Sequence, residues 1–208
     1  MLLVAAFLAV SLLVFVGATE GIDLAASGFA HESSGNIVLD LFMSSVTEVG
    51  DVFYMLVFTI VLIIIRRTRR IGIALLILLV LSTLVTGYVK CGVNRERPDL
   101  EFAGSPFIID LSPDTFSLFC DGGFNASYPS GHVSRAMVFA VVLGFALSER
   151  FPRGCYFLLL YPALMGLSRV YLVEHFPADV VGGALLGALL AGAVGGKTGL
   201  RSVLRSKS

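Results

Sequence analysis

Long apolar stretches separated by short polar segments dominate the pattern of hydrophobic and polar positions along this chain. A helix that crosses a hydrocarbon core of about 30 Å needs roughly 20 residues, at about 1.5 Å per residue. The apolar periodicity of Ile37–Val49 predicts either an extension of the short second stretch or a helix lying in the membrane interface. The pattern therefore predicts an all-α membrane protein, a six-transmembrane-helix bundle, in which residues 1–208 form a single domain. The six predicted spans are, approximately, 2–17, 52–65, 71–89, 133–148, 154–173 and 179–196.

Composition supports this assignment and excludes several other classes of protein. Of the 208 residues, 56% are hydrophobic and 14% are charged, whereas an ordinary soluble domain is about 45–50% apolar and about 25% charged. So short a chain cannot bury this excess of apolar residues, which indicates an integral membrane protein. The 15 basic residues are balanced by 15 acidic ones, which disfavours a nucleic-acid partner, and three cysteines are too few for a disulfide-rich secreted scaffold.

The first apolar stretch also fits a second role. It ends in Val16-Gly17-Ala18, which would suit a cleaved signal peptide, but no basic residue precedes it. We favour a membrane span and keep the signal peptide as the alternative.

The uneven distribution of basic residues predicts how the bundle is oriented, because loops rich in Lys and Arg stay in the cytoplasm. Three segments hold ten of the 15 basic residues and one acidic residue, Glu149. The ten are Arg66, Arg67, Arg69, Arg70, Arg150, Arg153, Lys197, Arg201, Arg205 and Lys207. We therefore expect both termini in the cytoplasm. The predicted outer loops are 18–50, 90–130 and 169–178.

The remaining polar residues form three clusters, all on the predicted outer side. Ionisable residues near a membrane boundary are costly and usually mark a functional site. We therefore expect an extracytoplasmic active site. The clusters are Lys90 to Pro98, Pro129 to His132, and Ser168-Arg169 with His175 and Asp179.

These clusters have the chemistry of a phosphate-binding site. Lys90, Arg97 and Arg169 offer three positive charges to a dianion, and an arginine can bind two oxygens at once. Ser130 and Gly131 lie where the fourth span begins, so backbone N–H groups at a helix N-terminus can face the same anion.

Two histidines complete the predicted site. His175 and Asp179 are four residues apart, which would place them on one face of a helix. A carboxylate there fixes the imidazole tautomer and stabilises the imidazolium that forms during attack. This makes His175 the predicted nucleophile and leaves His132 as the general acid, with a phosphohistidine intermediate that water later hydrolyses.

Other functions use the same residue types. A metal site would need more than the two ligands of His175 and Asp179, and three nearby cations would repel a divalent ion, so we predict no metal and no cofactor. A lipid-phosphate transporter commonly shows internal repeats with broken helices, which we do not find in the sequence. A lipid-phosphate binding protein would not need the His–Asp pair. Transport and binding are kept as alternatives.

At these residues the chain resembles the type-2 phosphatidic acid phosphatase family, which is related to the vanadium haloperoxidases. The motifs KxxxxxxRP, PSGH and SRxxxxxHxxxD mark that family, and all three are complete here, in order and without gaps. The resemblance implies a metal-independent phosphatase in which His175 attacks phosphorus, Asp179 orients it and His132 protonates the leaving oxygen. The residues implied to hold the phosphoryl oxygens are Lys90, Arg97, Ser130, Gly131 and Arg169.

The resemblance also implies a class of substrate. Members act on membrane lipid phosphates or pyrophosphates, among them phosphatidate, phosphatidylglycerophosphate, diacylglycerol pyrophosphate and polyprenyl pyrophosphates. A small chain without a soluble domain fits these lipids best, and a soluble phosphate ester is the alternative substrate. We expect the partners to be the bilayer and the lipid phosphate, and the sequence indicates no particular oligomeric state.

Several further residues near the motifs invite predictions. Cys91 and Cys120 both lie on the predicted outer side, where disulfides persist, and we hypothesise a bridge between them. Asn125-Ala-Ser127 matches a glycosylation acceptor, but a glycan there would crowd the next motif, so we expect none. Arg135 either adds charge to the site or reaches the membrane interface. The candidates for selecting the headgroup are Asn94, Arg95 and Glu96.

Overall fold

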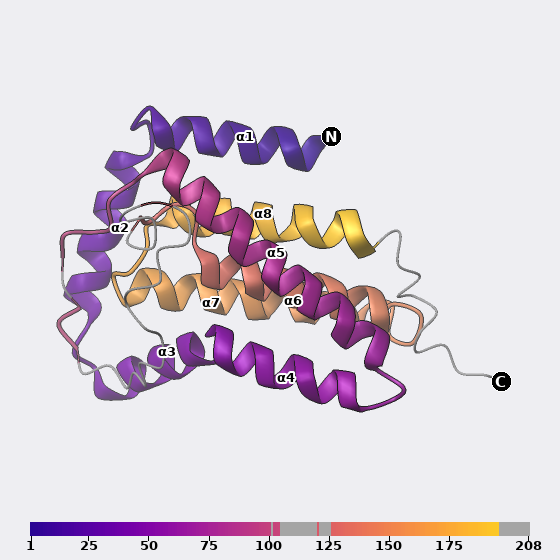
Figure 1. Ribbon diagram of the computed structural model, residues 1–208. Coiled ribbons are helices and arrows are strands. Elements are labelled where there is room, and N and C mark those ends of the chain that lie inside the picture. Colours follow the sequence, from indigo (N-terminus) through magenta and orange to yellow (C-terminus); the bar gives the residue numbers. More distant parts are fainter. Residues whose placement is uncertain (101, 105–119, 121–125, 196–208) are drawn as a thin grey trace.

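A computed structural model describes residues 1–100, 102–104, 120 and 126–195 of the chain, and every regular element within them is helical (Figure 1). The all-α class predicted from the apolar pattern is thus confirmed for these residues. In chain order the helices are α1 (Leu2–Phe15), α2 (Glu20–Ser33), α3 (Ile37–Val49), α4 (Val52–Ile64), α5 (Arg69–Val93), α6 (Gly131–Leu147), the 3-10 helix η1 (Gly154–Leu159), α7 (Leu160–Tyr171) and α8 (Pro177–Gly195).

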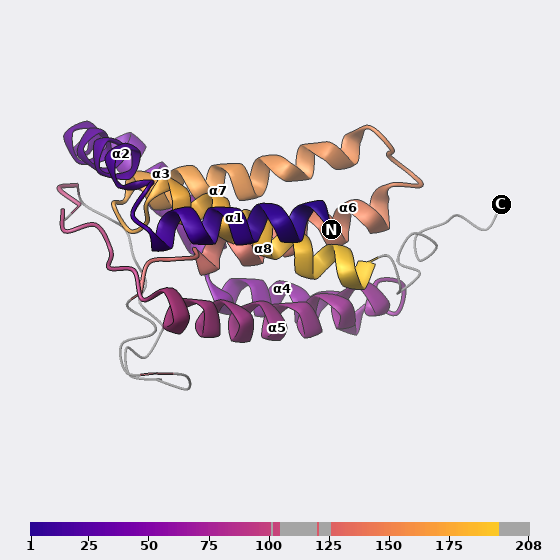
Figure 2. The same cartoon turned by 90° about the horizontal axis from the view of Figure 1, so that it is seen from above.

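Helix α6 lies at the centre of the bundle, and α5, α7 and α8 all pack against it (Figures 1 and 2). Most of its buried residues are small or β-branched, and Ala136, Val138 and Val142 are inaccessible to solvent. Leu78 of α5 and Met165 of α7 are equally buried in the same core. Small side chains on the central helix let its neighbours approach closely, as is common between membrane helices.

Two glycines of α8 let this helix touch the backbone of α6. A Cβ atom on Gly183 would lie 2.4 Å from the carbonyl oxygen of Ser130, and one on Gly187 would lie 2.3 Å from that of Ser134. No other residue type can be accommodated without moving the helices apart. This contact fixes the first turn of α6, and with it the PSGH motif, against the first turns of α8.

The segment 18–50, predicted as an outer loop, contains the two helices α2 and α3. Helix α2 follows the apolar helix α1 at a bend of 81°, and α3 precedes the apolar helix α4 at a bend of 52°. The first bend follows Gly17, whose φ is +74°, and the second follows Gly50. Asp51 is the N-cap residue of α4, and its side chain accepts a hydrogen bond from Phe53 N at 2.8 Å. Ile37–Val49 is therefore a separate helix and not a straight extension of the second span.

The helix over Ile37–Val49 was predicted but α2 was not, because some polar residues of α2 face the protein interior, as Asp40 of α3 also does. Asp23 and Ser27 of α2 are buried, while Phe29 on the same helix is 73% exposed. In α3, Asp40 is buried and Val38 is 74% exposed. This arrangement is the reverse of an amphipathic helix in water and suits helices whose outer faces meet lipid.

By length and composition, two of the described helices are able to cross a membrane on their own: α5, and α8 over Pro177–Val194. Counting each bent pair as one broken span raises the number to four. Helix α6 is apolar but, at 17 residues, shorter than a typical span. The six-span arrangement therefore stays a prediction.

The segment 154–173, predicted as one continuous span, is divided. Residues Gly154–Leu159 form the 3-10 helix η1, and the α-helix begins only at Leu160. Pro162 explains the change, because proline lacks an N–H donor and its ring excludes an α-helical turn before it, whereas it is tolerated in the first turn. Helix α7 is consequently 12 residues long.

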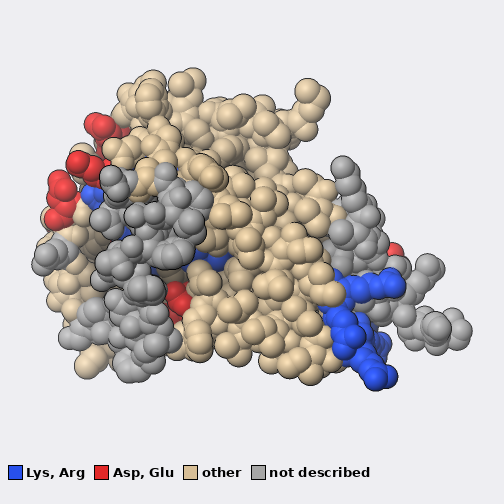
Figure 3. Space-filling model, in the orientation of Figure 1, with Lys and Arg blue, Asp and Glu red and all other residues tan. Residues whose placement is uncertain are grey.

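Charged side chains gather at opposite ends of the molecule. Arg66, Arg67, Arg69 and Arg70 are exposed at the turn between α4 and α5, and Figure 3 shows this basic patch at one end. At the other end lie acidic side chains over α2, where Glu20 and Glu32 are exposed. Most of the face between them carries no charge, as expected for a surface in contact with lipid tails (Figure 3).

Gly183→Ala should destabilise the protein by about 1–3 kcal/mol, because the added methyl group collides with the Ser130 carbonyl and forces α8 away from α6. The measurement is the thermal unfolding midpoint of the purified full chain in detergent. Gly192→Ala is the matched control on the same helix, since a Cβ there meets nothing within 4 Å. Equal unfolding temperatures for the two variants would contradict the close contact.

Candidate active site

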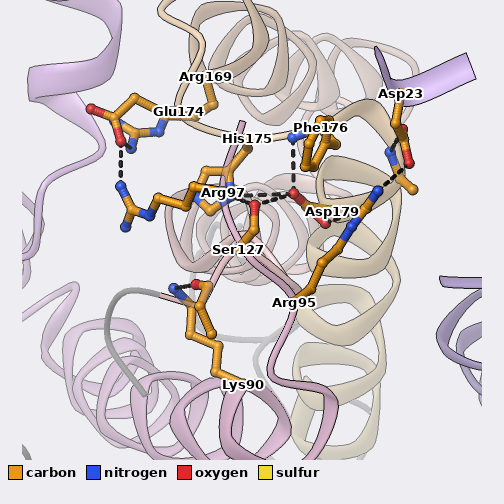
Figure 4. A network of polar contacts seen from close by, with 12 residues as sticks. Asp23, Lys90, Arg95, Arg97, Ser127, Arg169, Glu174, His175, Phe176 and Asp179 are labelled. Atoms are coloured by element: carbon orange, nitrogen blue, oxygen red, sulfur yellow. Dashed lines mark hydrogen bonds and ion pairs between the residues drawn. The ribbon is translucent and has the colours of Figure 1, made fainter. Parts of the chain in front are cut away.

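The three motif clusters meet at the end of the bundle opposite the basic patch. Lys90 lies in the last turn of α5 and Arg169 in the last turn of α7, while Ser130 caps α6 and Asp179 lies in the first turn of α8. Figure 4 shows side chains from the end of α5, the loop after it, the turn between α7 and α8, and the start of α8 converging on one region. The structure thus brings together residues from segments that are up to 89 positions apart, as the polar clusters predicted.

A tight turn holds His175 between α7 and α8. The backbone N–H groups of Glu174 and His175 both donate to the carbonyl oxygen of Arg169, at 3.0 and 3.2 Å. Val173 has φ +57°, a left-handed conformation that is strained for a β-branched residue. His175 itself is 2% exposed. Because α8 begins at Pro177, His175 lies before the helix, so the prediction that His175 and Asp179 share one helix face was wrong.

The turn still places the His175 imidazole next to the Asp179 carboxylate. Nδ1 of His175 is 3.6 Å from Oδ2 of Asp179, which is an electrostatic contact and longer than a hydrogen bond. The same Oδ2 accepts hydrogen bonds from Ser127 Oγ and from Phe176 N, the latter at 2.8 Å. Because Nδ1 faces Asp179, Nε2 is the ring nitrogen that remains for a substrate.

Ser127 is a site residue that the sequence did not reveal. Its hydroxyl donates to Asp179, lies 3.3 Å from Nδ1 of His175 and is fully buried. Ser127 therefore sits between the two residues of the His–Asp pair (Figure 4). The sequence showed it only as part of a possible glycosylation acceptor, and its Asn125 lies outside the described residues. Its position three residues before Ser130 was the only available signal.

The predicted phosphate-binding arginines meet a carboxylate that was also missed. Glu174 Oε2 accepts hydrogen bonds from Arg97 and is 3.1 Å from the Arg169 guanidinium (Figure 4). Burial acts to raise the pKa of Glu174, but the charges of Arg169 and Arg97 outweigh it and lower this pKa, so the side chain is ionised. Lys90, the third predicted cation, donates from Nζ to the carbonyl oxygen of Ala126 at 2.6 Å. Two of the three cations thus already share an anionic oxygen.

The start of α6 supplies further polar groups. Ser130 occupies the N-cap position of α6 without a side-chain capping bond, and its N–H donates to the backbone oxygen of Asp179 at 3.0 Å, which ties the two helix N-termini together. Within the described residues, seven buried side-chain atoms have no hydrogen-bond partner, and they include Ser130 Oγ, Arg135 Nε and Arg169 Nε. Buried polar atoms normally have partners, so these three are suited to bind ligand oxygens.

The structure also places His132 and Arg135. His132 lies in the first turn of α6, partly buried and within electrostatic reach of Arg169, Arg135 and His175. Arg135 is 8% exposed, and its guanidinium would be 3.2 Å from a Cβ on Gly131. Of the two alternatives for Arg135, the structure therefore supports added charge at the site and not a position at the membrane interface.

The hypothesised disulfide is present. Cys91, just after Lys90, is bonded to Cys120, with a Cα–Cα distance of 6.1 Å. Cys155 is free. The bond attaches the long segment between the first two motifs to the end of α5, next to the site.

A comparison with protein families decides what this arrangement represents. Residues 71–195, which contain all three motifs, match the PAP2 superfamily. The chain belongs to the PAP2 superfamily.

Curated PAP2 relatives match over part of their length. The chain is 31% identical over 147 residues to the undecaprenyl-diphosphatase of Sulfolobus acidocaldarius, an alignment that covers 70% of this chain and 64% of that protein. It is 32% identical over 118 residues to the lipid A 1-phosphatase of Rhizobium johnstonii, covering 57% of this chain and 44% of the relative. The chain therefore spans less than two thirds of the length of either relative.

Two solved structures share the PAP2 fold described here. The first transmembrane PAP2-type phosphatidylglycerolphosphate phosphatase from Bacillus subtilis superimposes with a TM-score of 0.75 and 24% identity, covering 99% of this chain and 97% of that one. Aquifex aeolicus LpxE gives a TM-score of 0.61 with 25% identity, over 83% of this chain and 93% of that one. The first likeness extends over α1 to α4 as well as the region matched by the family.

His175 should remain a neutral imidazole throughout the physiological pH range. Burial lowers its pKa to about 3; the contact with Asp179 opposes this shift, and the charges of Arg169 and Lys90 add to it. NMR of ¹⁵N-histidine-labelled protein in detergent, with His175→Gln for assignment, should show the neutral form from pH 8 down to about pH 4. A His175 signal that titrates near pH 6.5, the value of a free imidazole, would contradict the buried geometry.

Reduction of the Cys91–Cys120 bond should change the mobility of the protein on a denaturing gel. The bond closes a loop with a sequence separation of 29, and such bonds stabilise a fold by about 2–4 kcal/mol, so a lower unfolding temperature should accompany reduction. Cys120→Ser should abolish the mobility shift, and Cys155→Ser, which removes the free thiol, should preserve it. Identical oxidised and reduced samples would refute the bond.

Proposed function

We propose that this chain is an integral membrane phosphatase that hydrolyses a lipid phosphate or lipid pyrophosphate, without a metal ion, through a phosphohistidine at His175. One observation carries the proposal: a buried imidazole is held at Nδ1 by Asp179 and Ser127, next to arginines that already bind a carboxylate oxygen. A neutral, oriented imidazole is a nucleophile, and clustered guanidinium groups stabilise phosphoryl oxygens. The roles that follow are part of the proposal.

The reaction would take place in two displacements. In the first, Nε2 of His175 forms a bond to phosphorus and the bond from phosphorus to the leaving oxygen breaks. His132, which the charge of the bound phosphate dianion keeps protonated, gives its proton to that oxygen. Asp179 stabilises the positive charge on the phosphorylated imidazole. In the second, a water molecule gives a proton to His132 and its oxygen attacks phosphorus. The P–N bond then breaks, releasing inorganic phosphate and restoring both histidines.

The phosphoryl group would be held by Lys90, Arg97 and Arg169, with Ser130 Oγ and the Gly131 N–H at the helix N-terminus. In the structure Glu174 takes the place of an anionic ligand, since its carboxylate binds both arginines. A phosphate has the same charge sign and more oxygens, so it can replace Glu174 between the two guanidinium groups. The partnerless Ser130 Oγ and Arg169 Nε would then acquire acceptors.

Two features support a lipid as the substrate. The relatives are named for lipid substrates, an undecaprenyl diphosphate and the 1-phosphate of lipid A, and a solved structure for phosphatidylglycerolphosphate. The helices beside the site expose apolar side chains, such as Ile22 of α2 and Ile37 of α3. A lipid could keep its tails against such surfaces while presenting its phosphate to the loops between the helices.

The active site is proposed to face the extracytoplasmic side, with both termini in the cytoplasm. Arg69 and Lys90 lie at opposite ends of α5, about 30 Å apart at 1.5 Å per residue, which equals the thickness of a hydrocarbon core. The exposed arginines before α5 favour the cytoplasm. The site at the other end of this helix would then be outside, where the Cys91–Cys120 disulfide is stable.

The purified full chain in detergent, with EDTA present, should release inorganic phosphate from at least one lipid. The panel holds phosphatidate, phosphatidylglycerophosphate, diacylglycerol pyrophosphate and polyprenyl pyrophosphate, with glucose 6-phosphate as the soluble ester. His175→Ala should abolish release, because it removes the nucleophile and none of the cations. His31→Ala, a histidine of α2 outside the site, is the control and should retain full activity.

Each other outcome contradicts part of the proposal. Turnover that survives in His175→Ala would refute the phosphohistidine. Release only after a divalent metal is added would refute the metal-free mechanism. Preference for glucose 6-phosphate would replace the lipid substrate with a soluble one, and no release under any condition would favour transport or binding.

A further inference from the structure

Arg95 joins Asp179 to an acidic residue of the N-terminal helices. Its guanidinium Nη1 is 2.9 Å from Asp179 Oδ1, and its Nη2 is 2.7 Å from Oδ2 of Asp23 in α2 (Figure 4). Both carboxylates are buried, with side-chain exposures of 2% for Asp23 and 0% for Asp179. Asp23 lies outside residues 71–195, the region that matches the family. The contact therefore links the shared catalytic region to a helix that the family match does not include.

Arg95 makes two further contacts, and its partner Asp23 makes one. Its guanidinium carbon lies 4.2 Å from the ring centre of Phe176, a cation–π contact. Its carbonyl oxygen accepts a hydrogen bond from Ser127 N at 2.7 Å. Asp23, its second ionic partner, accepts a hydrogen bond from Ala178 N at 3.1 Å through Oδ1. Asp23 therefore also fixes the backbone between His175 and Asp179.

The two oxygens of Asp179 have separate partners. Oδ1 faces Arg95, whereas Oδ2 faces Ser127, Phe176 N and the imidazole of His175. Rotation of the carboxylate would break contacts on both sides, so Arg95 determines the plane in which Oδ2 meets the imidazole. A planar guanidinium with two separate N–H groups suits this task, because it can bind two carboxylates in fixed directions.

We propose that Arg95 and Asp23 are positioning residues for the phosphatase reaction: Asp23 holds Arg95, and Arg95 holds both Asp179 and Ser127 in the orientation that His175 requires. The inference rests on the proposed function and adds two residues that make no contact with the phosphoryl group. It also corrects the expectation that Arg95 selects the headgroup, since its guanidinium is directed at Asp179 and Asp23.

Asp23→Asn is the sharpest test, because it keeps the shape of the side chain and removes its charge. Asp40→Asn is the matched control: Asp40 is an equally buried carboxylate on the neighbouring α3, and its Oδ1 accepts a hydrogen bond from Tyr171 at 2.6 Å. Both variants replace a buried carboxyl group by an amide, but only Asp23 is joined to Asp179 through Arg95. A merely structural role for Asp23 would make the two variants alike.

We expect Asp23→Asn to lower kcat about tenfold, the lower end of the range for outer partners that orient an active-site ligand. The KM and the inhibition constant of inorganic phosphate should stay within about twofold, because the phosphate-binding cations are intact. Asp40→Asn should leave kcat per folded molecule unchanged. Arg95→Ala, which leaves two buried carboxylates together, should lose about 100-fold, and Arg95→Lys should recover part of that loss.

The histidine NMR signals provide a readout that does not depend on turnover. The Nδ1 resonance of His175 should shift in Asp23→Asn and stay in place in Asp40→Asn, because only the first substitution loosens Asp179. An unshifted resonance, or an unchanged kcat with a raised KM, would overturn the positioning role. Failure of the proposed function looks different: the wild type and His175→Ala would then release equal amounts of phosphate.

Discussion

The Asp179 carboxylate is the group on which the rest of the site depends. It is completely buried, and an unpaired charge in such a place would be costly. Three hydrogen-bond donors satisfy it, Arg95, Ser127 and the Phe176 N–H, and the His175 imidazole lies 3.6 Å away. Satisfying this one charge brings the end of α5, the segment before α6 and the turn before α8 to a single point. The contacts that stabilise the carboxylate also hold His175, the proposed nucleophile, beside it.

The fold supports this point by placing polar groups inside and apolar groups outside. Helix α8 lies directly on the backbone of α6 because Gly183 and Gly187 leave no side chain between them. That contact sets the distance between Ser130 and Asp179, whose backbones are hydrogen-bonded. Helices α2 and α3 turn Asp23 and Asp40 inward and most of their large apolar residues outward, so Asp23 can reach the site while the surface remains suited to lipid. A polar site can thus exist at the boundary of an apolar bundle.

The sequence allowed prediction of the helical class and of the residues that gather at the site, because each motif lies at the end of an apolar helix and such ends coincide in a bundle. It did not reveal Asp23, Ser127 or Glu174. Asp23 is 72 positions from Arg95 and Ser127 is 52 positions from Asp179, and no local pattern specifies partners at that distance. The same limit explains why α2 was not predicted, since the partners of its buried polar residues lie far along the chain, whereas the apolar periodicity of Ile37–Val49 did predict α3. His175 was placed on a helix because its spacing from Asp179 fits one, and Pro177 starts that helix two residues later.

The central claim is that His175 carries the phosphoryl group during turnover, and trapping that intermediate tests it most directly. The enzyme would be mixed with its substrate, quenched in alkali, where phosphohistidine survives, and digested for mass spectrometry. The account predicts one added phosphoryl group on the peptide that contains His175, absent from His175→Ala and scarce in Asp23→Asn. Active turnover with no phosphoryl group on His175, or with one on His132 in its place, would contradict the account.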